Sequence, residues 1–339
     1  MRADLARLGD ERSVPSDLDP GPPTVFRADA TWPALLADRI DALERHPDDV
    51  RTVDPRVAAD ALRAAGAAVA QHAAAEQPER VVLEHGALVL RGLALRVTLD
   101  GALEEVATQR ACDAPEPDTA RVVRSGGRRE PLVDASLRQR AAAQLRARPP
   151  HLRMLEALAL ALQEDLVLIG PSERSDAGAG RVQWLQVAFP SGWDPGAMVG
   201  ASFERLHAPV PDAEVLRRAA PALVQAMRTK GPFVRYVWGL SPSGARSRHP
   251  RHARPMPSDH PLDGAWLRVE RQTTLPLPAV GAGLFAIGVH VTPLPVALAA
   301  PDRRAAFADA VASLTPVSRR YKGVPWDEAT VRAWCATLG

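Results

Sequence analysis

His207 is the first candidate for chemistry, and it lies in the segment LHAPVP, residues 206–211. The prolines two and four residues after it fix their own φ angles and push the residues between them toward extended structure. The chain around the imidazole is therefore expected to be stiff. A neutral imidazole held in this way suits an axial iron ligand. The alternative is that His207 caps or hydrogen-bonds a turn beneath a sheet, and the spacing leaves both interpretations open.

A predicted strand, WLRVERQT at 266–273, carries charged residues on both of its faces. Because side chains alternate along a strand, Arg268, Glu270 and Gln272 are expected on one face and Arg271 on the other. An arginine held there can pair with a carboxylate, including that of a cofactor, through two parallel hydrogen bonds. The alternative is an Arg–Glu ion pair on a solvated face of the sheet.

Small residues alternate toward a histidine in a third segment, GLFAIGVHVT at 283–292. Ala286, Gly288 and His290 are expected on one face, with bulky apolar residues on the other. The small side chains leave room for a flat ligand to approach the backbone, or equally for a closely packed helix.

Three further histidines, at 249, 252 and 260, lie in the segment RSRHPRHARPMPSDH, residues 246–260. A histidine-rich loop can bind a metal ion, but this one has few carboxylates and many arginines. A solvated loop or a lid is therefore the favoured interpretation.

Other chemistries lack the motifs that they need. The chain contains no GxGxxG that opens a helix after a strand, no Walker sequence, no GxSxG, no HExxH and no kinase loop. Its two cysteines, Cys112 and Cys335, form no CxxC pair, which argues against a cysteine-ligated zinc site or an in-chain iron–sulfur cluster. Redox chemistry would therefore need another metal centre or an organic cofactor.

Charge and hydropathy restrict the partners. Lys and Arg total 42 against 40 Asp and Glu, a formal charge of +2, so there is no electrostatic reason to expect nucleic acid or a membrane surface. The first 17 residues lack an apolar stretch, and no run of 18 apolar residues follows. We therefore expect a cytoplasmic protein.

The periodicity of the 339-residue chain predicts an α+β fold, a mixed sheet with helices outside it. We expect three parts: an irregular arm and helical region at 1–79, a core at 80–300 and a C-terminal helical segment at 301–339. The predicted elements are helices at 32–43, 54–75, 136–145, 151–164, 212–227, 302–314 and 326–338, a hairpin or meander at 80–98, and strands at 165–170, 181–190, 233–240, 266–274 and 283–292.

Taken in order, several short motifs resemble those of the haem-dependent oxidative N-demethylases, specifically their haem-binding alpha-type subunit with a PAS-like core. The resemblance covers 163–323, about half of the chain, and extends more loosely over the helical N-terminal part. The motifs are QEDL at 163–166, FPSxW at 189–193, Gly200, HxPVP at 207–211, RxxW at 235–238, LRVERQT at 267–273, LP at 277–278, LFxI at 284–287 and YKG at 321–323.

The resemblance implies a b-type haem (heme b) held by a PAS-like antiparallel or mixed sheet with flanking helices. It implies dioxygen as co-substrate and oxidative removal of a methyl group from a small amine as formaldehyde. Electrons would come from a separate flavin and iron–sulfur reductase. A non-catalytic haem- or ligand-binding PAS-like sensor or partner subunit is the alternative.

Site residues follow from the matching motifs. His207 is expected to be the proximal iron ligand, with His290 as the distal hydrogen-bond donor or, alternatively, the ligand. The other expected roles are propionate pairing for Arg268 and Arg271, a cofactor contact for Trp238, and a substrate ammonium or proton relay for Glu270. This chain has Val237 where the family usually has Asn, and Gly288 and His290 where it tends to have Arg and an aromatic residue. These departures suggest a larger biosynthetic intermediate rather than dimethylamine as substrate.

Overall fold

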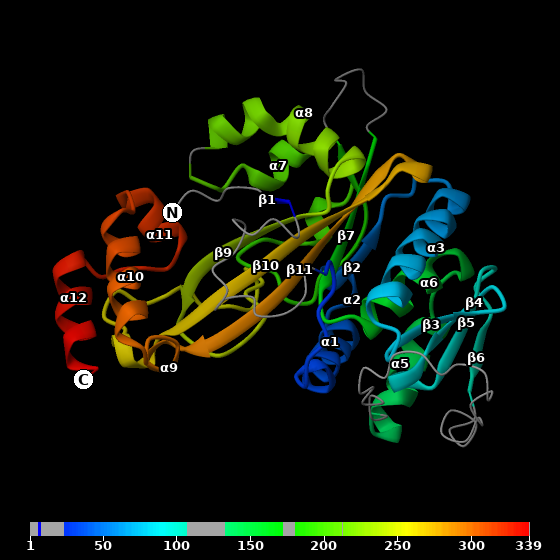
Figure 1. The fold of residues 1–339 in the computed structure, drawn as a ribbon, viewed down its shortest axis with the longest axis horizontal. Coiled ribbons are helices and arrows are strands. Elements are labelled where there is room, and N and C mark those ends of the chain that lie inside the picture. Colours follow the sequence, from blue (N-terminus) through cyan, green and yellow to red (C-terminus); the bar gives the residue numbers. More distant parts are fainter. Residues whose placement is uncertain (1–5, 8–23, 107–132, 172–179, 212, 339) are drawn as a thin grey trace, which may run out of the picture.

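The computed structural model describes residues 6–7, 24–106, 133–171, 180–211 and 213–338. Its centre is a seven-stranded sheet in the order β1-β9-β10-β11-β7-β8-β2, and every neighbouring pair is antiparallel (Figure 1). The strands are β1 Ala6–Arg7, β2 Arg51–Val53, β7 Asp165–Gly170, β8 Arg181–Gln186, β9 Phe233–Ser241, β10 Trp266–Leu277 and β11 Ala282–Pro293. The described chain is therefore α+β, as predicted.

A second, four-stranded antiparallel sheet has the order β3-β4-β5-β6. Its strands are β3 Val81–Glu84, β4 Ala87–Leu90, β5 Leu95–Thr98 and β6 Leu103–Glu105. The turn between β3 and β4 has φ of 49° at His85 and 72° at Gly86, and two successive positive φ values make the tight turn that suits a twisted hairpin. The predicted hairpin or meander at 80–98 is confirmed.

Helices pack in three groups around the large sheet. In Figure 1, α7 and α8 lie over one face of the sheet, the C-terminal helices stand at one end, and α3, α5 and α6 lie at the other end beside the small sheet. The helices are α1 Trp32–Arg45, α2 Pro47–Val50, α3 Ala59–Glu76, α5 Ala135–Arg146, α6 Pro150–Ala161, α7 Phe203–His207, α8 Ala213–Thr229, α9 Leu294–Ala297, α10 Pro301–Ala312, α11 Pro316–Tyr321 and α12 Glu328–Thr337. Short 3₁₀ turns occur at η1 Arg91–Leu93, η2 Gly196–Met198, η3 Leu262–Gly264 and η4 Pro278–Val280.

Some helix boundaries differ from the predicted ones because side chains bind the backbone there. The helix expected from residue 54 begins only at Ala59, since Asp54 accepts hydrogen bonds from the backbone and side chain of Arg56 in a turn. The helix expected to reach residue 164 ends at Ala161, where Arg39 donates to the carbonyls that follow. Most of the predicted arm, and residue 212 at the start of the helix expected over 212–227, lie outside the described residues.

The β10–β11 hairpin confirms the predicted alternation of side chains. Arg271 pairs with Gly288 and Val269 pairs with His290 in its register, so these four residues share one face. Arg268 and Glu270 occupy the other face. The division of the chain at residues 79/80 and 300/301 stays a prediction.

Candidate functional site

One face of β9 and β10 carries a chain of hydrogen-bonded polar side chains. Glu270 is at its centre and accepts from Arg268 Nη2 at 3.2 Å and from Gln272 Nε2 at 2.8 Å. Gln272 in turn accepts from Arg235 Nε at 2.6 Å. Phe285, on the same face, packs against the apolar cluster of α7 and α8. A largely buried carboxylate is therefore held in a fixed orientation on the side that these helices cover.

Most hydrogen bonds of the Arg268 guanidinium go to backbone carbonyl oxygens. It donates to the carbonyls of Arg246 and Phe189, the latter at 2.7 Å, as well as to Glu270. Phe189 belongs to the FPSGW segment singled out in the sequence, and its own N–H is bound by Asp165 Oδ2 at 2.8 Å. Arg268 thus orients Glu270 and fixes two loops against the sheet.

His207 ends the short helix α7, and its ring makes two contacts with Phe203, one helical turn earlier. Nδ1 lies 2.8 Å from the carbonyl oxygen of Phe203, and the two rings stack with centroids 4.0 Å apart. Because a carbonyl can only accept, Nδ1 must carry the proton and Nε2 the lone pair. Nε2 has no hydrogen-bond partner within the described ranges. Nε2 therefore offers a free, oriented lone pair, which is what coordination of a metal ion requires.

The environment of His207 keeps its ring neutral. Burial lowers the pKa of His207, and the nearby charge of Arg235 lowers it further, while the bond to Phe203 opposes both effects. The His207 ring is held in place by a different contact from the one that the sequence predicted. Residues 208–211 form turns rather than an extended segment, and the ring is held by Phe203 rather than by the prolines.

Cations outnumber carboxylates around Glu270. Arg235 and Arg248 face it, burial lowers the pKa of both, and the Glu270 charge opposes that shift. Arg248 donates to the Leu240 carbonyl, whereas the terminal nitrogens of Arg235 have no partner in the part of the chain that is described. Nε of Arg268 is buried and unpaired there as well. Such a cluster favours an anionic ligand, because like charges repel without one.

A C-terminal segment runs along the edge of β9, and Lys322 Nζ lies 4.7 Å from the centre of the Trp238 ring. Lys322 accepts a hydrogen bond from Leu240 N at 2.7 Å and donates from Nζ to the Trp238 carbonyl at 2.8 Å. Gly323 has φ of 68°, and a Cβ there would lie 2.6 Å from the Leu240 oxygen, so the close approach requires glycine. Tyr321 next to it has a pKa raised by burial and by the charge of Glu270. These residues were noted only within the YKG motif and were not predicted as site residues.

The structure divides the predicted site residues into two sets. His290, Arg271 and Trp238 share the other face of the sheet, because Trp238 and His290 both pair with Val269. The ring of Trp238 packs edge-on against Phe307 of the C-terminal helices. Arg271 donates to the backbone carbonyls of Thr24 and Val25. A planar ligand on the Glu270 face therefore cannot contact His207 and His290 together.

The second face contains a small cavity of about 10 Å³ bordered by Glu164, Arg27, Arg271 and His290. Glu164 accepts a hydrogen bond from Arg27 N at 2.8 Å, and its other oxygen is buried without a partner among the described residues. Burial raises the pKa of Glu164 to about 7, against the hydrogen bond from Arg27 and the charge of Arg271. Sequence reasoning included Glu164 only in the QEDL motif.

Glu164→Gln is expected to stabilise the protein at pH 8 and to change little at pH 5. A carboxyl whose folded pKa is raised contributes its stability fully below its unfolded pKa, near 4.5, and loses it as pH rises through about 7. Removing the charge should recover roughly 3 kcal/mol of unfolding free energy at pH 8. Urea unfolding at both pH values measures this, and equal effects at pH 5 and 8 would contradict it.

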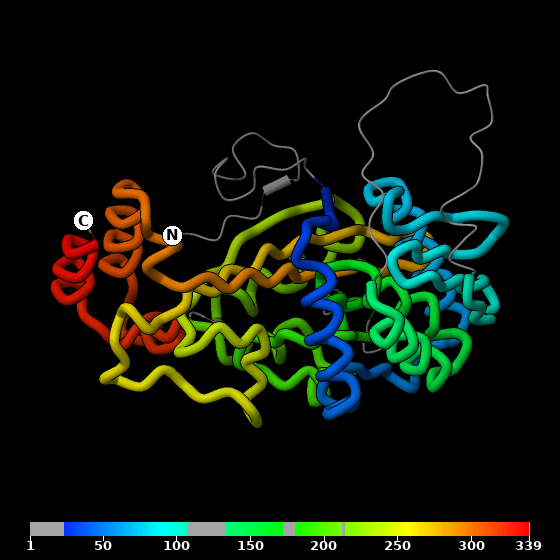
Figure 2. Tube along the Cα trace, turned by 90° about the horizontal axis from the view of Figure 1, so that it is seen from below, coloured from blue at the N-terminus to red at the C-terminus, as the bar shows by residue number. Residues whose placement is uncertain are grey.

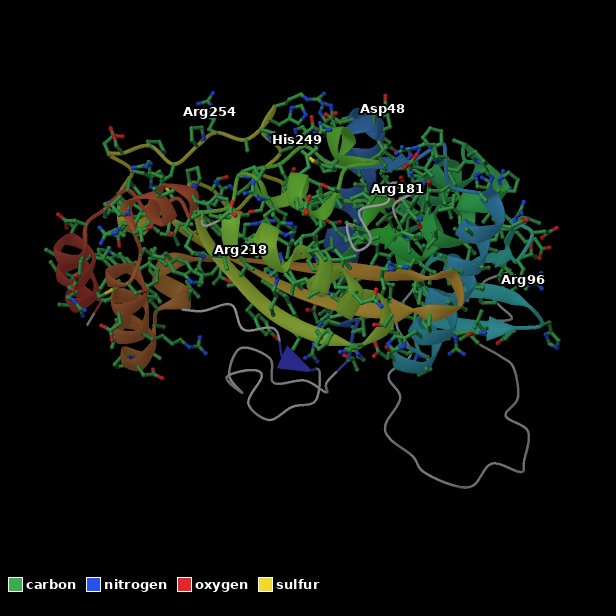
Figure 3. All side chains as sticks on the ribbon, turned by 90° about the horizontal axis from the view of Figure 1, so that it is seen from above. Asp48, Arg96, Arg181, Arg218, His249 and Arg254 are labelled. Atoms are coloured by element: carbon green, nitrogen blue, oxygen red, sulfur yellow. The ribbon has the colours of Figure 1, made fainter. Side chains whose placement is uncertain are left out.

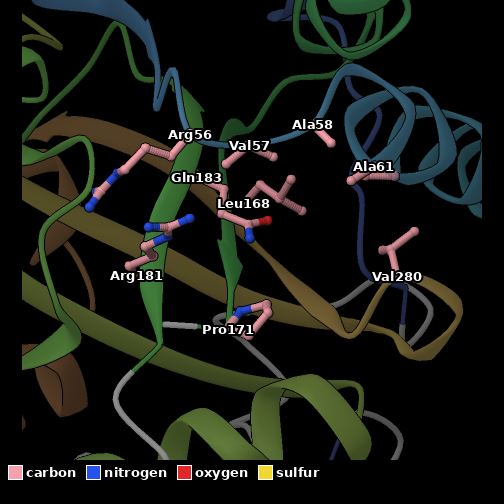
Figure 4. Close-up of a pocket in the computed structure, with 10 residues that line it drawn as sticks. Arg56, Val57, Ala58, Ala61, Leu168, Pro171, Arg181, Gln183 and Val280 are labelled. Atoms are coloured by element: carbon pink, nitrogen blue, oxygen red, sulfur yellow. The ribbon is translucent and has the colours of Figure 1, made fainter. Parts of the chain in front are cut away.

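The larger cavity, about 220 Å³, lies elsewhere and is bordered by none of the predicted site residues. Figure 4 shows Arg56 and Arg181 on one side of it and Ala61 and Val280 on the other. Both arginines pair with Asp54, at 2.8 and 3.5 Å. Their charge is thus already partly balanced, and the candidate site remains the Glu270 face.

The site so far defines a class: an α+β protein with a neutral histidine donor beside a cation-rich, buried polar face. A model of the family described as haem-dependent oxidative N-demethylase, alpha subunit-like, matches residues 126–331, and this chain belongs to that family. The matched range contains every residue of the Glu270 face and His207. The family name supports a haem cofactor and oxidative chemistry, and "alpha subunit" implies a partner subunit.

A search of curated proteins found no match. None of the helices in the described ranges is both long and apolar enough to span a membrane.

Proposed function

We propose that this chain is the haem-binding component of a monooxygenase. It would demethylate or otherwise oxygenate a small amine or a larger biosynthetic intermediate, with electrons from a separate flavin and iron–sulfur reductase. The family match supports the haem, and the Nε2 lone pair of His207 is the observation that carries the assignment of the iron ligand. The antiparallel sheet with helices over one face supports a PAS-like core that lies mainly within 80–300, between the helical region 1–79 and the segment 301–339, although β1 and β2 of the same sheet precede residue 80.

The donor set fits a haem. His207 offers a neutral nitrogen, and the unpaired nitrogens of Arg235 suit a propionate carboxylate. Arg248 and Arg268 add positive charge, so a dianionic group would relieve the excess. Arg271 and His290, which are on the other face, would not contact this haem. Arg271 would instead hold the N-terminal segment through the Val25 carbonyl, and both residues would border the second cavity.

Haem, when bound, supplies an iron centre at which dioxygen is activated for oxidation of the methyl group. Each demethylation consumes dioxygen, two electrons and two protons, and yields formaldehyde, water and the shortened amine. Glu270 would bind the substrate ammonium or hold a proton on a carboxylate oxygen, because Arg268 and Gln272 fix its orientation. Val237, the register partner of Glu270, makes the neighbouring surface apolar and suits a substrate with more hydrocarbon than dimethylamine.

Glu270→Gln is expected to keep the haem spectrum and to lower formaldehyde release at least 100-fold, the low end of the effect of a general acid or base. The assay uses dithionite or a reductase, dioxygen and a panel of methylamines of increasing size. Glu204→Gln, on α7, is the matched control and should retain activity. Equal rates in both variants would remove Glu270 from the chemistry.

The absorption spectrum tests the cofactor itself. We expect a Soret band that shifts on reduction and on binding of carbon monoxide. A colourless protein that does not take up added hemin would contradict the haem assignment. A haem-loaded protein that oxidises none of the amines would instead favour the non-catalytic sensor or partner subunit.

A further inference from the structure

Three histidines and two aspartates gather where the loop 241–263 passes the end of α1, and none of them belongs to the Glu270 face. Figure 2 shows this yellow loop beside the end of the blue helix α1, and Figure 3 shows His249 and Asp48 toward the same edge of the molecule. The group consists of His46, Asp49, Asp194, His249 and His252, and their ligand atoms form two overlapping sets within 4.8 Å.

In the first set, His46 follows the last residue of α1 and Asp49 lies in α2. The rings of His46 and His252 stack with centroids 4.1 Å apart and an angle of 25°. Nε2 of His252 lies 3.4 Å from Oδ2 of Asp49. Neither nitrogen of His46 has a hydrogen-bond partner within the ranges that the structure describes. One ligand nitrogen of each imidazole and one carboxylate oxygen of Asp49 therefore lie within 4.8 Å of one another.

The carboxylate of Asp49 is already oriented in the way that a metal ligand usually is. Its side chain is buried, and its Oδ1 pairs with Arg251 Nη1 at 2.8 Å, which leaves Oδ2 toward the histidines. A carboxylate that is oriented by a second partner is typical of metal ligands.

The second set suits a metal less well. Arg251 joins Asp49 to Asp194, at 2.8 and 2.7 Å, and already supplies the positive charge between them. The Arg251 N–H points at Nδ1 of His249 at 3.2 Å, so the proton of the neutral ring is on Nε2, facing Asp194. His249 instead positions His252, whose N–H donates to the His249 carbonyl at 2.9 Å.

We propose that His46, Asp49 and His252 bind one divalent transition-metal ion, with water in the remaining positions. Two histidines and a carboxylate are ligands that Zn²⁺ and related ions accept. The ion would tie the loop 241–263 to the end of α1. Because the same loop carries Arg246, whose carbonyl binds Arg268, the ion would also steady the Glu270 face. The proposal does not depend on haem.

Calorimetric titration of chelator-treated full-length protein with Zn²⁺ tests the site. We expect one ion per chain, and at least a tenfold weaker Kd for His46→Ala and for His252→Ala. His260→Ala removes an imidazole from the same loop outside the cluster and should leave the Kd unchanged. Circular dichroism confirms that each variant is folded, and the two ligand variants provide independent tests.

Crystals soaked with Zn²⁺ give a second readout. Anomalous scattering at the zinc edge should locate the ion between His46, Asp49 and His252. The proposal is overturned if the wild type binds no Zn²⁺, if both His46→Ala and His252→Ala bind it as the wild type does, or if the anomalous peak lies elsewhere. A normal Soret band in the same samples would show that the haem assignment survives that outcome.

Discussion

His207→Ala should abolish the Soret band of the purified protein or change its position and shape. The neutral imidazole of His207 lies beside the Glu270 face. Its Nε2 lone pair is free to bind iron, because Nδ1 carries the proton and donates it to the Phe203 carbonyl. Alanine removes the proposed iron ligand and one local hydrogen bond, so the fold should persist. Added imidazole is expected to restore part of the original spectrum by filling the space of the lost ring.

His290→Ala is the matched control for this experiment. It also removes a histidine from the matched range, but on the opposite face of the sheet. Its spectrum should be that of the wild type. Full haem loading with an unchanged spectrum in His207→Ala would exclude His207 as the ligand, and loss of the band in His290→Ala would assign that role to the other face.

Arg39→Leu should lower the free energy of unfolding by at least about 3 to 5 kcal/mol, the cost of breaking a buried ion pair by removing one partner. Arg39 is fully buried and donates to Asp165 at 3.2 Å. It also donates to four backbone carbonyls, those of Ala159, Leu162, Gln163 and Glu164. Leucine would leave all five acceptors without this partner, and each unpaired buried group adds to the cost.

The loss should extend to the candidate site. Asp165 binds the N–H groups of Ala188 and Phe189, and the Phe189 carbonyl holds Arg268. Urea unfolding measures the stability of Arg39→Leu. Arg45→Leu on the same helix is the control, because its exposed pair with Asp41 at 3.6 Å is worth less than about 1 kcal/mol. If Arg39→Leu changes the free energy of unfolding by less than about 1 kcal/mol, the Arg39–Asp165 pair does not stabilise this part of the fold.

The sequence by itself determined the local arrangement of the strands and the family. Alternation placed Arg268, Glu270 and Gln272 together and Arg271 opposite them, because the period of a strand depends only on its backbone. Short motifs indicated the haem-dependent family, which the family model confirms over 126–331. The segments FPSGW and YKG were recognised too, although their partners were not.

Only the tertiary structure decided which residues meet. His207 and His290 were expected around one ligand, yet the register of β10 and β11 puts His290 on the face opposite Glu270, because each register pair fixes the face that neighbouring strands share. His207 comes from α7 and lies near Arg235, on the Glu270 side. Arg235 reaches the Glu270 face because β9 pairs with β10 in a register that sets it opposite Gln272, and the charge of Arg248 comes from the loop that follows β9. The end of α6 is likewise set by Arg39, more than 100 residues away. Such contacts depend on the whole chain, because register and packing are settled by all the elements together.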